Sequence, residues 1–143
     1  MCLMLYIGTA GELPLASSPD LAIEAVDAAR HDVTQWFSRP AVRFVGAHTG
    51  CSCGFPSVMA ESPIEFYEGM PLQSDDRAAD LRSVRALLEV VGQVVTGSET
   101  VELYPVADGD QSMAPKGVIE WRLRALDPER LFFNERFMHV VRG

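Results

Sequence analysis

Basic side chains are scarce in this sequence. Among 143 residues, Lys and Arg total 12 against 20 Asp and Glu, which gives a formal net charge of −8. A chain of this charge is repelled by phosphate backbones and by anionic lipid headgroups. We therefore expect neither nucleic acid nor a membrane surface among its partners.

Cysteines and long apolar runs are also few. The opening apolar run, residues 2–7, has no cationic leader and ends at Gly8, so it is too short for a signal peptide or a membrane span. The three cysteines are Cys2, Cys51 and Cys53, an odd number that suits reduced thiols better than a disulfide framework. We expect a cytoplasmic protein with free thiols.

The rest of the composition is that of an ordinary folded domain. Apolar residues make up 48% of the chain and charged residues 22%, which argues against disorder and is enough for one hydrophobic core at this length. No repeat, low-complexity tract or shift in composition divides the chain. The sequence therefore predicts a single domain over residues 1–143.

Strand patterns recur along the whole chain. Residues 21–26 suit either a strand or a helix, and Pro105 indicates an edge strand or a strand end because proline lacks an N–H. His139 is expected to lie on a strand with one side wet. Short apolar or alternating runs predict strands at residues 2–7, 41–46, 101–106, 119–123 and 137–142.

One long helix is predicted over residues 75–96. Ser74 is a capping residue before it, Gly97 is a natural stop, and the apolar residues Leu81, Val84, Leu88, Val91 and Val95 recur at helical spacing. Shorter helices are predicted at residues 29–37 and from Asp127 through Phe132, and residues 56–73 predict a proline-rich loop or lid.

These elements predict the α+β class. We expect a mostly antiparallel sheet of about five strands, with the long helix packed on one face and the helix at residues 29–37 beside it.

The residues most suited to chemistry follow the strand at residues 41–46. His48, Cys51 and Cys53 lie within six residues, and Cys2 lies on the opening strand, which is a candidate neighbour. Four such ligands match the tetrahedral coordination of Zn²⁺. We therefore predict a metal site, such as a zinc site, formed by Cys2, Cys51, Cys53 and His48. The spacing is unusual, because structural zinc sites separate paired ligands by two to four residues and here only Ser52 intervenes.

Three other interpretations of the same residues stay open. A thiol redox protein or enzyme would use Cys51 and Cys53 with His48 as the base, although Pro56 leaves no helix start beside the thiols. Removal of Met1 would expose Cys2 as an N-terminal nucleophile, an opening that resembles some amidotransferase-like hydrolases, whereas a retained Met1 blocks it. Alternatively the cysteines are structural, Cys2 acting as a small apolar strand residue.

An interaction protein without chemistry is the remaining alternative. In that case residues 56–73 or an exposed sheet edge would pair with a second copy of the chain, and the protein would be a homodimer.

The Met1-Cys2 opening strand, the strand at residues 40–46 and the sequence Gly50-Cys51-Ser52-Cys53-Gly54-Phe55 resemble a group of small bacterial proteins. Their loop reads Gly-Cys-Gly-Cys-Gly-Phe, so Ser52 departs from the pattern. The likeness covers mainly residues 1–8 and 37–55. It implies a bacterial, cytoplasmic protein and no particular activity.

Overall fold

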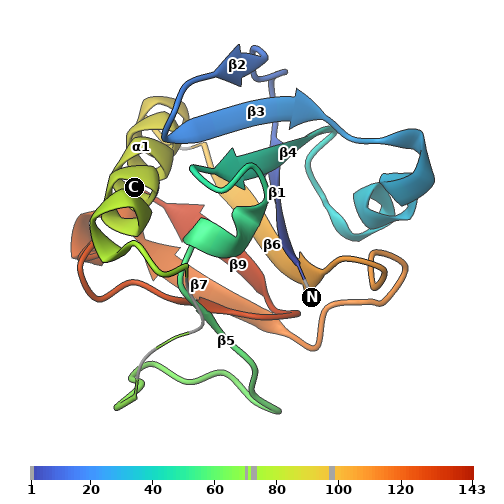
Figure 1. Cartoon of the computed structure of the whole chain (residues 1–143). Coiled ribbons are helices and arrows are strands. Elements are labelled where there is room, and N and C mark those ends of the chain that lie inside the picture. The colour runs from blue at the N-terminus through green and yellow to red at the C-terminus, as the bar shows by residue number, and fades with distance from the viewer. Residues whose placement is uncertain (1, 70, 72–73, 97–98) are drawn as a thin grey trace.

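The computed structural model describes residues 2–69, 71, 74–96 and 99–143 (Figure 1). It confirms the α+β class, with a mixed sheet at its centre. The strand order is β2-β3-β4-β1-β6-β9-β7, and a separate parallel pair joins β5 to β8. The strands are β1 (Leu3–Thr9), β2 (Ala16–Ser17), β3 (Leu21–Ala25), β4 (Ala41–Ala47), β5 (Ser57–Val58), β6 (Val101–Ala107), β7 (Val118–Arg122), β8 (Phe133–Asn134) and β9 (Met138–Arg142).

The main sheet is larger than the five strands predicted from the sequence. It has seven strands, one of which, β2, has only two residues. Most neighbours are antiparallel, as predicted, but β7 runs parallel to β9 at one edge. The ambiguous segment at residues 21–26 forms strand β3, which pairs with β4. The two additional strands are β2, which has only two residues, and β3, whose sequence pattern also suits a helix.

Pro105 lies in an inner strand, β6, between β1 and β9. The ladder with β9 covers only Val101 to Leu103, so the chain on that side has already diverged at Pro105. The Pro105 carbonyl accepts a hydrogen bond from the backbone N–H of Arg136 instead. The proline therefore lies near a strand end, one of the two positions predicted for it.

Alternate residues of the central strand β1 supply two separate cores. Leu5 and Ile7 belong to the larger core with α1 (Arg77–Val94). Tyr6 faces the opposite side, where Val33 and Tyr104 form a second, smaller core. This period of two is what a strand covered on both faces requires.

The long helix α1 begins slightly later than predicted. The Asp76 carboxylate, rather than Ser74, caps it by accepting a hydrogen bond from the Ala79 N–H at 3.0 Å. Val84, Leu87 and Val91 are its most buried apolar residues, so the buried stripe lies slightly to one side of Leu88. The predicted stop, Gly97, lies outside the described residues.

Two of the predicted short helices differ in the structure. The segment after Asp27 forms a 3₁₀-helix, η1 (Ala28–Trp36), and packs on the sheet face opposite α1 rather than beside it, because Val33 and Trp36 join the second core. The segment at Asp127 makes a single turn and no helix; the 3₁₀-helix η3 (Leu123–Ala125) precedes it. Residues 56–73 are mostly irregular where described, as predicted, apart from β5.

His139 is fully buried, which corrects the expectation that one side is wet. Its ring lies against Trp121 and Phe133, with ring centroids 4.6 and 5.3 Å away. The Nε2 atom accepts from the Asn134 N–H at 3.1 Å, and Nδ1 lies 2.9 Å from the Phe137 carbonyl oxygen, to which it donates. This pattern is that of a neutral imidazole with both nitrogens satisfied.

None of the helices in the described ranges has the length and apolar character required to cross a membrane.

Candidate functional site

The candidate site lies where β1 and β4 separate. The ladder between these strands runs from Thr9 back to Leu5, opposite Val45, and then β4 continues beside β3 alone. The chain turns after β4 and returns as a short 3₁₀-helix, η2 (Ser52–Gly54), which contacts both strands. The loop that carries Cys51 and Cys53 thus lies where β1 and β4 are no longer paired, in contact with both strands.

Ser52 fixes this loop to both strands. Its side chain is completely buried. The Ser52 Oγ accepts a hydrogen bond from the Leu5 N–H at 2.7 Å and donates one to the Val45 carbonyl oxygen at 2.6 Å. Because Ser52 points into the protein, the residues on either side of it can turn toward the surface. This arrangement explains how two cysteines with a single intervening residue direct their sulfurs to one place.

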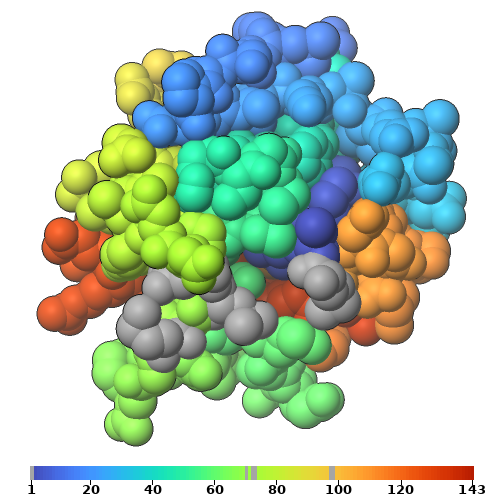
Figure 2. Space-filling model, viewed as in Figure 1, coloured from blue at the N-terminus to red at the C-terminus, as the bar shows by residue number. Residues whose placement is uncertain are grey.

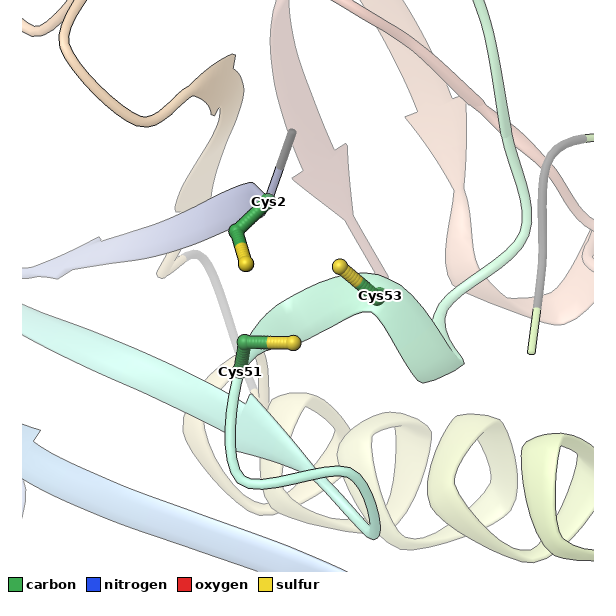
Figure 3. Close-up of side chains that lie close together, drawn as sticks. All are labelled: Cys2, Cys51 and Cys53. Atoms are coloured by element: carbon green, nitrogen blue, oxygen red, sulfur yellow. The ribbon is translucent and has the colours of Figure 1, made fainter.

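The structure brings three of the predicted site residues together. The Sγ atoms of Cys2, Cys51 and Cys53 all lie within 4.8 Å of one another (Figure 3). Cys2 is exposed and the other two are partly buried, so the group lies at the surface. In Figure 2 the dark-blue N-terminal residues lie directly beside the blue-green segment around residue 50. All three thiols are free in the structure.

The surroundings distinguish the thiols of Cys51 and Cys53. Burial and, next, the hydrogen bond with Cys51 raise the pKa of Cys53 to about 11, although the Leu3 N–H, which donates to the Cys53 Sγ at 3.3 Å, acts to lower it. Burial also acts to raise the pKa of Cys51. Hydrogen bonds with the Thr49 hydroxyl, 3.5 Å away, and with Cys53 outweigh it, so the pKa of Cys51 is lowered overall. Cys51 is therefore the more readily ionised of the two.

The spacing of the three sulfurs suits a common metal ion. Sulfur ligands of one Zn²⁺, each about 2.3 Å from the ion, lie about 3.8 Å apart in a tetrahedron. Sulfurs within 4.8 Å of one another need to approach by only about 1 Å to reach that geometry. Thiolates are the soft ligands that zinc and monovalent copper prefer.

Two glycines allow the loop to take this path. Gly50 has a φ of +85°, a backbone conformation that residues with a side chain rarely adopt. A Cβ at Gly54 would lie 2.8 Å from both the Cβ of Ala47 and the ring of His48, which is too close. The loop therefore packs directly against the last residue of β4 and the residue that follows it.

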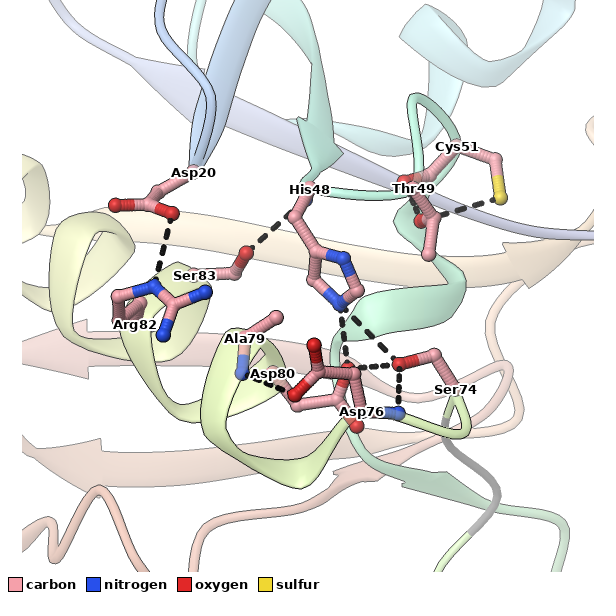
Figure 4. Close-up of polar contacts among 10 residues, drawn as sticks. All are labelled: Asp20, His48, Thr49, Cys51, Ser74, Asp76, Ala79, Asp80, Arg82 and Ser83. Atoms are coloured by element: carbon pink, nitrogen blue, oxygen red, sulfur yellow. Dashed lines mark hydrogen bonds and ion pairs between the residues drawn. The ribbon is translucent and has the colours of Figure 1, made fainter.

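His48 belongs to a different group from the three thiols. Its Nε2 lies 2.7 Å from Oδ1 of Asp80 and 3.2 Å from Oγ of Ser74 (Figure 4). The Ser74 hydroxyl also donates to Asp80 Oδ1, and the His48 N–H donates to the Ser83 Oγ at 3.0 Å. His48 thus ties the start of the cysteine loop to the first turns of α1, and the ring is directed away from Cys51.

Asp80 is a residue of this group that sequence reasoning missed. It is completely buried, and its Oδ2 has no hydrogen-bond partner among the described residues. Its spacing carried a signal, because Asp80 lies at helical intervals from Val84, Leu87 and Val91, the apolar stripe of α1. A charged residue on the buried face of a helix indicates a specific polar partner.

The group does not have the geometry of a serine hydrolase triad. In such a triad the serine and the acid contact opposite nitrogens of the histidine ring. Here Ser74 and Asp80 both contact Nε2. The arrangement holds the loop on the helix and offers no activated hydroxyl.

Two cavities differ in their relation to the thiols. One, of about 880 Å³, follows the edge strand β7 and has no cysteine in its lining. A smaller one, of about 270 Å³, is lined by Cys51 together with Met4, Tyr6 and Arg30, among others. Cys51 therefore borders the smaller of these two cavities.

No family model, no curated protein and no solved structure matches the chain.

Proposed function

We propose that this protein binds a thiophilic metal ion, such as zinc, through Cys2, Cys51 and Cys53. The observation that supports the proposal is that two segments about 50 residues apart present three sulfurs within 4.8 Å of one another at the surface. The lowered pKa of Cys51 favours the thiolate form that binds metals. The pKa of Cys53 is raised, so the ion would have to displace its proton, and the Leu3 N–H would then donate to the Cys53 thiolate. Three protein ligands leave a fourth position for another group.

The first experiment is elemental analysis of protein purified under reducing conditions without a metal-affinity tag. We expect near-stoichiometric metal, together with thiols that become reactive only after chelation or unfolding. Replacement of Cys2, Cys51 or Cys53 by serine should release the ion.

His48→Asn provides the matched control, because the structure places this ring against Asp80 and outside the sulfur group. We expect it to retain the metal. Loss of metal from His48→Asn in a folded protein would instead support the four-ligand set that the sequence predicts. Metal-free protein that also fails to take up Zn²⁺ would refute the proposal.

The unequal pKa values of Cys51 and Cys53 support thiol–disulfide exchange as a second candidate function. The Cys51 thiolate would attack a partner's disulfide and release one partner thiolate. The Cys53 thiol would then lose its proton and attack the Cys51 sulfur, which releases the second partner thiolate and leaves a Cys51–Cys53 disulfide. His48 is directed at Asp80 and would not act as the base.

Alkylation by iodoacetamide, followed by peptide mapping, tests this alternative. Cys51 should react first, and faster than Cys53, in metal-free protein at neutral pH. Equal rates for the two cysteines would exclude the asymmetry on which the exchange depends.

A further inference from the structure

Met4 lies on β1, the strand that Cys2 directly precedes. Side chains two residues apart on a strand share a face, so Met4 lies on the same side of β1 as Tyr6, which also lines the 270 Å³ pocket. Met4 is half-buried and packs at the margin of the second core. It also lines the 270 Å³ pocket together with Cys51. The pocket lining thus contains two sulfur-bearing side chains, Met4 and Cys51, and Cys51 is one of the three grouped thiols.

The ligand chemistry around the thiols is otherwise uniform. Among the described residues, no imidazole or carboxylate joins the group formed by Cys2, Cys51 and Cys53. His48 is engaged by Asp80, and the Asp27 carboxylate in the pocket lining is engaged by Arg30 at 2.9 Å. The Glu24 carboxylate also lines the pocket, but it is a hard oxygen ligand, which Cu(I) does not favour. Among the described residues that line the pocket, the thioether of Met4 is the soft atom that remains beside Cys51. Its side chain has three rotatable bonds, and the adjoining pocket offers space in which the sulfur can turn.

A thioether discriminates between metal ions. Zinc in proteins takes thiolate, imidazole and carboxylate ligands, whereas monovalent copper accepts thiolates and thioethers together. We propose that the site binds Cu(I), with Met4 supplying the fourth ligand beside the three thiolates. This inference rests on the proposed metal-binding function. No electron transfer is involved, since the ion enters in the monovalent state and displaces only the thiol protons.

The test is an anaerobic titration with Cu(I) against a chromophoric Cu(I) chelator, in wild-type protein and in Met4→Leu. Leucine has nearly the volume of methionine, so the fold should persist. We expect Met4→Leu to weaken Cu(I) binding roughly tenfold or more, a loss of about 1.4 kcal/mol or more. Zn²⁺ binding should be unchanged. Met59→Leu is the control, because Met59 is 62% exposed and does not line the pocket.

X-ray absorption at the copper edge provides a second readout. Four sulfur neighbours are expected in the wild type and three in Met4→Leu. Equal Cu(I) affinity in both proteins, or an equal loss of Cu(I) and Zn²⁺ affinity in Met4→Leu, would overturn the role of Met4 while leaving the thiol site intact. A failure of the proposed function is recognised separately, because Cu(I) affinity would then be unaffected by Cys51→Ser.

Discussion

Replacing Ser52 by alanine should destabilise the protein far more than a serine-to-alanine change at the surface. The substitution removes the acceptor of the buried Leu5 N–H and the donor to the Val45 carbonyl, and it leaves almost the same volume filled. A buried polar group left without a partner costs about 1–3 kcal/mol. With two groups affected, we expect the free energy of unfolding to fall by about 2–4 kcal/mol.

Urea denaturation followed by circular dichroism measures this change. The midpoint should fall without a change in slope, and the melting temperature should drop by roughly 6–12 °C, at about 3 °C per kcal/mol for a chain of this length. Ser17→Ala is the control, since Ser17 is exposed on the two-residue strand β2. A Ser52→Ala protein within 0.5 kcal/mol of the wild type would refute the view that this hydroxyl joins β1 to β4.

Three further predictions concern the core, the loop and pH. Burial lowers the pKa of His139 to about 4, whereas the unfolded chain has a histidine pKa of about 6.5. Unfolding titrations should therefore show full stability above pH 6.5 and a loss of up to about 3 kcal/mol as the pH falls from 6.5 to 4. His139→Gln should flatten this pH dependence. Gly54→Ala should lower the melting temperature because its Cβ meets Ala47 and His48, whereas Gly11→Ala, with no atom within 4 Å, should not. Leu87→Ala should lower the free energy of unfolding, measured by chemical denaturation, by about 2–5 kcal/mol, and Leu88→Ala should lower it clearly less. The reverse order would contradict the buried face assigned to α1.

Local patterns in the sequence predicted the elements that carry strong periodicity. The apolar repeat of α1 and the alternating pattern of β7 each specify one element and its approximate bounds. The proximity of Cys2 to the loop at Cys51 also followed from local reasoning, because an opening apolar strand was a candidate neighbour of the strand at residues 41–46.

The choice of long-range partners was not predictable in the same way. His48 bonds Asp80, 32 residues further along the chain, and nothing in the residues around His48 distinguishes that contact from a contact with the nearby cysteines. The sequence also does not specify which face of the sheet η1 covers, because both faces of β1 are apolar. Such choices are decided by the packing of the whole chain rather than by local propensity.

The group of three thiols also has a consequence for chain entropy. Cys2 lies at one end of the chain and Cys51 and Cys53 lie after β4, so an ion held by all three would close a loop of about 50 residues that contains β1 to β4. A cross-link over a loop of that length lowers the entropy of the unfolded chain by an amount worth roughly 4 kcal/mol at 25 °C. An unfolded or nascent chain does not hold these sulfurs together. Metal uptake would therefore report that β1 has taken its place beside β4, and metal loss would return that entropy to the unfolded chain.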